Sequence, residues 1–384
     1  MVAEYSFPTT ILVGQGAGDA WINKINPNPQ QHFLIVTDKT ILSLGLCDWL
    51  TELLDGHQCQ YSVFADIHAN PIQEDVKKGV QVYSDSAATA IIAFGGGAAI
   101  DVAKAIKLEL AYPGGIEQFQ RDEQPWEQAL QASIDCYAFP TTAGTGSEVG
   151  RSAVIILESQ KDKTVLFHPQ IIPDIAVLEP KLTQGLPQAI TAATGIDALT
   201  HCLEAYLAPD IHPICDGIAL QGMELVLQFL PRAYCDGDDL EAREKIQLAA
   251  SMGAIAFQKG LGMVHSMAHP LSAYFNIHHG LANALVISQC LHFIEQQNLH
   301  ADEHKKLHTL NDLFKGQECH QAVLSKTMAN FVASLGISPG LNPHGVNQDD
   351  LPLLAEAAYR DPCTETNIIA VDQAQFLAVY KAVL

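Results

Sequence analysis

Basic residues are scarce in this chain of 384 residues, in which 21 lysines and arginines stand against 43 aspartates and glutamates. The formal net charge of −22 opposes binding to nucleic acid or to an anionic membrane, because both attract positively charged protein surfaces. We therefore expect neither a nucleic-acid partner nor a membrane partner. An acidic surface of this kind more often serves solubility.

Long apolar runs are also missing. No stretch approaches the roughly twenty residues needed to cross a bilayer. The beginning, Met1–Phe7, lacks the basic segment and apolar core of a secretory signal. The nine cysteines are scattered, odd in number and without a C-x-x-C pair, which disfavours a disulfide framework or a thiolate zinc site. These absences predict a cytoplasmic protein with reduced thiols.

The G-x-G-x-x-G fingerprint of dinucleotide-binding proteins is absent, but another glycine-rich segment is present. The apolar run Ala88–Phe94 has the length of a strand, stops at Gly95-Gly96-Gly97 and is followed by helical periodicity over Ala98–Lys107. Such a loop lets backbone N–H groups and the positive end of a helix approach a pyrophosphate. A tight turn explains the three glycines equally well, so this segment alone is a weak indication.

Two further segments strengthen the nucleotide hypothesis. The strand-like run Cys136–Phe139 continues into Pro140–Glu148, where hydroxyl side chains suited to phosphate and ribose gather among glycines. Another predicted strand, His32–Thr37, ends at Asp38, whose carboxylate can bind the ribose hydroxyls of adenosine and repel a 2′-phosphate. Asp38 therefore favours NAD over NADP, with a plain helix cap before Lys39 as the alternative.

Histidines are concentrated in one part of the chain. Four of the sixteen fall within fifteen residues, and they are His265, His269, His278 and His279. Upstream, Asp197 and His201 are four residues apart, so on a helix they can present an oxygen and a nitrogen to one ion. Mixed aspartate and histidine sets suit Fe(II), Zn(II) or Co(II) rather than Mg(II) or Ca(II). Ordinary packed or surface histidines are the alternative.

Four segments together resemble the iron-containing (group III) alcohol dehydrogenase family. They are Gly95–Lys104, Pro140–Val149, Gly195–His201 and Gly260–Gly280, in the order that the family has them. With the flanking segments, the resemblance spans essentially the whole chain. It implies an alcohol dehydrogenase that transfers a hydride between NAD(H) and a small alcohol or aldehyde, while a divalent metal polarises the substrate oxygen. The implied metal is Fe²⁺, with Zn²⁺ as the alternative, and the implied assembly is a homodimer.

The resemblance also implies individual site residues. The implied metal ligands are Asp197, His201, His265 and His279. His269 matches a histidine that lies near the metal without binding it, and we expect it to relay a proton or to position substrate. Besides Asp38, the implied cofactor-contacting residues are Asn70, Gly96, Gly97, Ala98, Asp101, Thr141, Thr142, Thr145, Ser147 and Lys163. Ala98 stands where many members have serine, and His278 where proline is common before the last ligand.

The predicted secondary structure changes near residue 180. Before it, short β-rich runs alternate with helical segments, and after it helix follows helix, as in Gly217–Phe229 and Leu240–Phe257. We predict an α/β dinucleotide-binding domain with a parallel sheet at residues 1–182. We predict an all-α metal-binding and substrate domain at residues 183–384, with the substrate pocket in a cleft between the two.

Two other functions compete with the dehydrogenase. One is a metal-dependent lyase or cyclase resembling dehydroquinate synthase, which shares the general architecture. The other is a catalytically silent nucleotide- or metal-binding protein. The Asp197/His201 pair and the Pro140–Val149 loop favour the dehydrogenase over the first, and four intact ligand positions argue against the second.

Overall fold

The computed structural model describes residue 7 and residues 9–112, 115–120, 132–159 and 163–384. It divides into two compact units. The first comprises Met1–Thr142 and Gly146–Thr183, and the second comprises Ala143–Thr145 and Gln184–Leu384. None of the described helices combines the length and the hydrophobicity that a bilayer-spanning helix requires.

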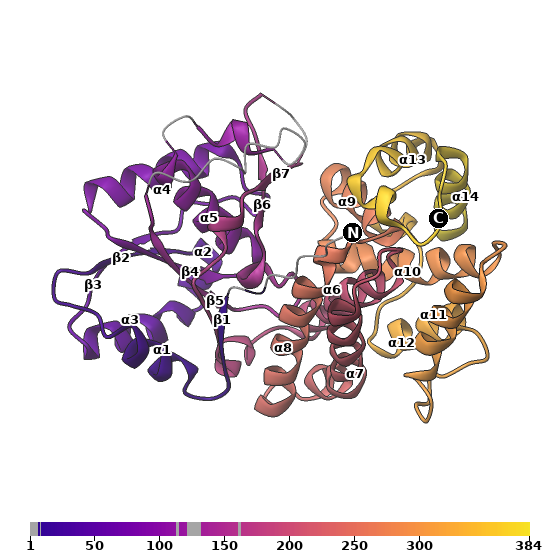
Figure 1. Ribbon diagram of the computed structural model, residues 1–384, viewed down its shortest axis with the longest axis horizontal. Coiled ribbons are helices and arrows are strands. Elements are labelled where there is room, and N and C mark those ends of the chain that lie inside the picture. Colours follow the sequence, from indigo (N-terminus) through magenta and orange to yellow (C-terminus); the bar gives the residue numbers. More distant parts are fainter. Residues whose placement is uncertain (1–6, 8, 113–114, 121–131, 160–162) are drawn as a thin grey trace. The chain divides into compact units, whose positions relative to one another are not determined.

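A six-stranded parallel sheet forms the centre of the first unit (Figure 1). In spatial order its strands are β1 (Thr10–Val13), β8 (Ile175–Leu178), β5 (Asp135–Pro140), β4 (Ala90–Gly95), β2 (His32–Val36) and β3 (Gln60–Phe64). Every residue of β4 is buried, because helices cover both faces of the sheet. This burial explains why the strand is a continuous apolar run in the sequence.

Successive strand residues point to opposite faces of this sheet. Phe33 packs with the helices of one face, which are α1 (Ala17–Ile25), α2 (Lys39–Ser43) and α3 (Leu46–Gly56). Leu34 packs with the helices of the other, which are α4 (Gln73–Asp85) and α5 (Gly97–Ala111). A separate antiparallel hairpin is formed by β6 (Ser152–Ile156) and β7 (Lys163–Phe167).

The connections between strands reverse direction beside β2. The chain runs from β2 outward to β3, returns to β4 on the other side of β2, and continues to β5. The carboxyl ends of β2 and β4 therefore flank a topological switch point. Open α/β sheets bind their ligands at such points.

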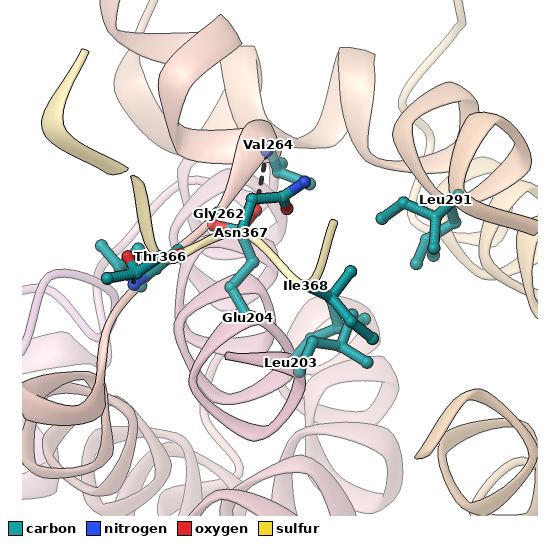
Figure 2. A pocket seen from close by; sticks show the side chains of 11 residues that line it. Leu203, Glu204, Gly262, Val264, Leu291, Thr366, Asn367 and Ile368 are labelled. Carbon is teal, nitrogen blue, oxygen red and sulfur yellow. Dashed lines mark hydrogen bonds between the residues drawn. The ribbon is translucent and has the colours of Figure 1, made fainter. Parts of the chain in front are cut away.

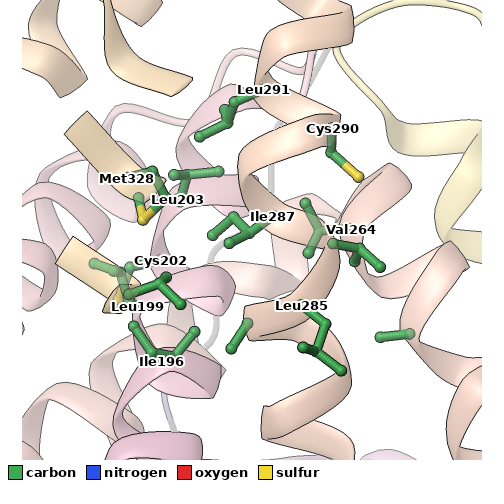
Figure 3. Packing of buried hydrophobic residues seen from close by; sticks show 14 of the residues in the cluster. Ile196, Leu199, Cys202, Leu203, Val264, Leu285, Ile287, Cys290, Leu291 and Met328 are labelled. Carbon is green, nitrogen blue, oxygen red and sulfur yellow. The ribbon is translucent and has the colours of Figure 1, made fainter. Parts of the chain in front are cut away.

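The second unit is built of helices (Figure 1). They are α6 (Gln188–Leu207), α7 (Pro213–Cys235), α8 (Leu240–Ala256), α9 (Met263–Phe275), α10 (His279–Glu295), α11 (Ala301–Asp312), α12 (Leu324–Ser334), α13 (Leu351–Arg360) and α14 (Gln373–Val383). Almost every residue of α6 after its first turn is buried, so neighbouring helices surround it. Figure 3 shows Leu199 and Leu203 of α6 packed with Ile287 and Leu291 of α10 and with Met328 of α12. The predicted fold class, a parallel α/β unit followed by a helical unit, is confirmed.

Candidate active site

The central helix α6 carries two of the predicted metal ligands. Asp197 and His201 lie one turn apart and are both buried. The distance between His201 Nδ1 and Asp197 Oδ1 is 4.0 Å. Helix α8 passes close by, because Gly253 has no side chain there: a Cβ on this residue would lie 2.9 Å from His201 Cβ.

Helices α9 and α10 bring the other two predicted ligands to the same place. Asn276 ends α9 in the left-handed conformation with φ 54°, and α10 begins at His279. His265 Nε2 lies 3.9 Å from Asp197 Oδ1, and His279 Nε2 lies 3.4 Å from it. The neighbouring His278 is exposed and lies outside this group. The structure therefore brings His279 to the other three residues and leaves His278 at the surface.

The four predicted ligands fit a divalent ion. One ligand atom from each of Asp197, His201, His265 and His279 lies within 4.8 Å of the others. His201 Nδ1 is buried without a hydrogen-bond partner in the protein, which is unfavourable unless a ligand binds it. Burial lowers the pKa values of His265 and His279 well below the ordinary value. Both imidazoles are therefore neutral at neutral pH, which is the form that binds a metal.

Asn283 lies within this cluster, and it was not among the residues predicted from the sequence. Its Nδ2 donates to Asp197 Oδ1 at 2.8 Å and lies 3.4 Å from Nε2 of both His265 and His279. The residue is fully buried and follows His279 by one turn on α10. The i, i+4 spacing was a local signal for it. Its partner Asp197, 86 residues away in the sequence, gave no signal.

Gly280 allows the beginning of α10 to approach α6. A Cβ on this residue would lie 2.1 Å from the backbone oxygen of Ala193 and 3.1 Å from Asp197 Cβ. Because the clash is with helix backbone, we expect Gly280→Ala to displace His279 and to destabilise the protein by about 1–3 kcal/mol. Metal content and denaturant unfolding measure the two effects.

Gly217 on α7 provides the matched control for this substitution. A Cβ there meets no atom within 4 Å, so Gly217→Ala should keep the metal and stabilise the helix by about 0.5–1 kcal/mol. Full metal uptake and unchanged stability in Gly280→Ala would show that the two helices do not pack this closely.

His269 lies beside the cluster and pairs with a different carboxylate. Its ring stacks on that of His279 with the centroids 5.3 Å apart, and its Nδ1 lies 2.7 Å from Asp361 Oδ2. Burial raises the pKa of Asp361, but His269 and hydrogen bonds from Cys363 outweigh this effect and bring that pKa to about 2. The carboxylate is therefore ionised and accepts the proton on Nδ1. Asp361 was not among the residues predicted from the sequence, in which it is 92 residues from His269.

The glycine loop predicted to hold a pyrophosphate joins β4 to α5. Gly95 has φ 154°, and a Cβ there would lie 2.8 Å from Ala99 Cβ, so the turn requires glycine. Helix α5 begins at Gly97, which places Gly96, Gly97 and Ala98 at its positive end. The next loop adjoins it, since the Thr142 side chain lies 3.5 Å from the position of a Cβ on Gly96. The Thr141 hydroxyl is buried there without a partner in the protein.

Asp38 has one oxygen in a helix cap and one near this glycine loop. Oδ1 accepts the N–H of Ile41 at 2.9 Å as the N-cap of α2. Oδ2 lies 3.8 Å from the position of a Cβ on Gly95. The cap that the sequence offered as an alternative is therefore present. The contact with adenosine ribose stays a prediction.

Other predicted cofactor residues have protein partners. Ser147 Oγ donates to Asp101 Oδ1 at 2.5 Å, and the N–H of Val154 donates to Asp101 Oδ2 at 3.0 Å. The buried Lys104 Nζ donates to Ser147 Oγ at 2.6 Å and to the carbonyl of Ser152. This network ties α5 to the loop after β5 and to β6.

Three further predicted residues lie in separate segments: Asn70 precedes α4, Lys163 begins β7, and Thr145 belongs to the second unit. Their contacts with the cofactor stay predictions, as do those of Asp101 and Ser147.

Known protein families match nearly the whole chain. Residues 8–180 match the family described as iron-containing alcohol dehydrogenase. Residues 191–384 match the C-terminal part of the Fe-containing alcohol dehydrogenase family. The chain belongs to the iron-containing alcohol dehydrogenase family. Its predicted family and reaction class, an oxidoreductase acting on a CH–OH group, are confirmed.

Individual members of the iron-containing alcohol dehydrogenase family resemble the chain over most of its length. The 4-hydroxybutyrate dehydrogenase of Cupriavidus necator is 36% identical over 342 residues, which cover 87% of each chain. The NAD-dependent methanol dehydrogenase of Bacillus methanolicus is 31% identical and covers 95% of this chain and 96% of its own. The crystal structure of a 1,3-propanediol oxidoreductase covers 100% of both chains with a TM-score of 0.89 at 27% identity. The predicted iron agrees with the description of the family, and the predicted NAD agrees with the name of the methanol dehydrogenase.

Proposed function

We propose that this family member is an NAD-dependent alcohol dehydrogenase whose divalent metal is held by Asp197, His201, His265 and His279. One observation carries this proposal: a carboxylate and three imidazoles from three helices converge within 4.8 Å. The family favours Fe²⁺ as the metal, and the donor set also suits Zn²⁺. We further propose a cytoplasmic location, which rests on the nine scattered cysteines typical of reduced thiols, and a homodimer, which rests on the family resemblance.

The chain's own residues prepare the site for this chemistry. When bound, the ion supplies Lewis acidity to the oxygen of a small alcohol or aldehyde, and NAD exchanges the hydride. Asn283 orients Asp197 through its 2.8 Å hydrogen bond. Burial keeps His265 and His279 neutral and their nitrogen lone pairs available. The contact with Asp361 holds the His269 ring beside His279, where we propose that it relays a proton or positions substrate.

We propose that the first unit binds NAD at the carboxyl ends of β2, β4 and β5. The backbone N–H groups at Gly96, Gly97 and Ala98 would hold the pyrophosphate at the start of α5. The unpartnered Thr141 hydroxyl supports this position, and Asp38 would accept hydrogen bonds from the adenosine ribose. Residues 1–182 then form the dinucleotide-binding domain, and residues 183–384 form the metal and substrate domain.

A substrate panel tests the proposed function. Metal-reconstituted protein is mixed with NAD and with methanol, 1,3-propanediol or 4-hydroxybutyrate, the alcohols that the names of the relatives suggest, and the absorbance of NADH is followed. The reverse reaction is followed with the matching aldehydes and NADH. We expect turnover with at least one pair. Protein that carries metal and binds NAD, but oxidises no alcohol and reduces no aldehyde, would instead support the silent binding protein.

Asp38 decides the choice between NAD and NADP in this proposal. Asp38→Gly should improve the use of NADP, because it removes a negative charge that repels the 2′-phosphate and a contact with the ribose of NAD. We expect the free-energy preference for NAD over NADP to fall by on the order of 1–3 kcal/mol. Glycine is the suitable replacement because it costs a helix cap only a few tenths of a kcal/mol. The ratio of kcat/KM for NAD to that for NADP is the measurement.

Asp38→Asn is the matched control. Asparagine caps a helix as well as aspartate does and lacks only the charge, so it should shift the cofactor ratio in the same direction with the α2 cap intact. An unchanged ratio in both variants would remove Asp38 from the adenosine site.

A further inference from the structure

Glu204 is a buried carboxylate next to the predicted ligands. It follows Asp197 by seven residues and His201 by three on α6, a spacing that puts all three on one face of the helix. Glu204 is only 3% exposed. A buried carboxylate needs hydrogen-bond donors.

The donors come from the first turn of α9. Glu204 Oε1 accepts the N–H of Val264 at 2.7 Å. Glu204 Oε2 lies 2.6 Å from the ring Nδ1 of His265 and also accepts the N–H of His265 at 3.4 Å. Figure 2 shows Glu204 reaching from α6 to the beginning of α9, with the bond to Val264 drawn.

The backbone around this contact is shaped to admit the carboxylate. A Cβ on Gly262 would lie 2.9 Å from Glu204 Oε1 and 2.7 Å from Asn367 Oδ1. Asn367 Oδ1 in turn accepts the N–H of Met263 at 3.1 Å. The N-cap residue of α9 makes no side-chain cap of its own. Glu204 and Asn367 therefore satisfy the free N–H groups of the helix that carries His265.

The contact with Glu204 fixes the tautomer of His265. A neutral imidazole has one N–H, and both oxygens of Glu204 receive N–H donors, so the carboxylate accepts the proton on Nδ1. Nε2 then keeps its lone pair and faces Asp197 Oδ1 at 3.9 Å. The His265 side chain is 1% exposed, so solvent cannot replace Glu204 as the acceptor. In metal sites, a carboxylate on the second ring nitrogen orients the histidine and strengthens it as a ligand.

We propose that Glu204 is a positioning residue of the metal centre, which holds His265 with its proton on Nδ1 and thereby presents Nε2 to the ion. The inference rests on the proposed function, because it assumes that Asp197, His201, His265 and His279 bind the metal. It extends the site from four ligands to the carboxylate behind one of them.

The test is the zinc affinity of the full chain, measured by competition with a chelator. Glu204→Gln keeps the shape of the side chain and loses the carboxylate, and it should weaken zinc binding by about 10–100-fold. Thr200→Val is the matched control: it removes one buried hydrogen bond from the same helix, that from Thr200 Oγ1 to the carbonyl of Ile196 at 2.7 Å, without touching His265. It should leave zinc affinity unchanged.

The outcomes separate this inference from the proposed function. Wild-type zinc affinity in Glu204→Gln, or an equal loss in Thr200→Val, would overturn the role of Glu204 and leave the four ligands in place. A wild-type protein that takes up neither zinc nor iron would instead overturn the proposed metal site itself.

A second measurement does not depend on a folded Glu204 variant. In ¹⁵N-histidine-labelled metal-free wild-type protein, the signals that disappear in His265→Gln should show the proton on Nδ1. A proton on Nε2 would contradict the inference.

Discussion

Alanine at His265 or at His279 is expected to abolish stoichiometric metal binding and alcohol-dependent NADH formation together. Each substitution removes one of the four proposed ligand side chains, whose ligand atoms lie within 4.8 Å of one another; His265 is on α9 and His279 on α10. The sheet of the first unit has its own hydrophobic core, so this unit should stay folded and retain NAD binding. Metal analysis, activity and NAD binding of the purified variants are the measurements.

His278→Ala is the control for this experiment. His278 adjoins His279 in the sequence but is exposed and outside the cluster, so its variant should keep the metal and the activity. Wild-type metal content in both His265→Ala and His279→Ala would reject the ligand assignment. Loss of metal in His278→Ala with retention in His279→Ala would exchange the roles of the two neighbours.

His269→Ala is expected to retain the ion and to lose turnover. The four proposed ligands remain in this variant, while the imidazole that pairs with Asp361 is gone. If His269 relays a proton, turnover should fall by about 10²–10⁴-fold and the pH profile of kcat should change. A smaller loss with an unchanged profile would indicate that His269 positions substrate.

Asp361→Asn tests the role of His269 through the carboxylate that pairs with it. The asparagine oxygen can still accept the proton on His269 Nδ1 but carries no charge, so the loss should be smaller than in His269→Ala and of the same kind. The metal content of His269→Ala shows whether His269 is itself a metal ligand. A metal-free His269→Ala protein would make His269 a ligand and would contradict its place outside the four-residue cluster.

The elements that the sequence predicted well are those whose burial leaves a simple pattern. β4 is buried at every residue and was visible as an unbroken apolar run, and the pair Asp197 and His201 marked α6 through its i, i+4 spacing. Two strands, β1 and β6, were missed. β1 is only four residues long and half exposed, and β6 pairs with β7 in a hairpin outside the main sheet.

The ligand-bearing segments were also predictable, but their partners were not. The family resemblance indicated His279 rather than its neighbour His278 as the last ligand, and the structure brings His279 to Asp197. The carboxylates that hold the histidines of α9 gave no such signal, because Glu204 is 61 residues from His265 and Asp361 is 92 residues from His269. Contacts between residues so far apart in the sequence depend on how helices cross. The periodicity along one helix does not specify that crossing.

We propose that one metal ion at these four residues supports NAD-dependent alcohol oxidation. Metal analysis of protein purified without oxygen, coupled to NADH formation before and after removal of the metal by a chelator, tests it most directly. We predict one equivalent of Fe²⁺ per chain, loss of activity with the metal, and recovery when Fe²⁺ or Zn²⁺ is added back. Full NADH formation by chelated protein that contains no metal would show that the reaction does not need the ion.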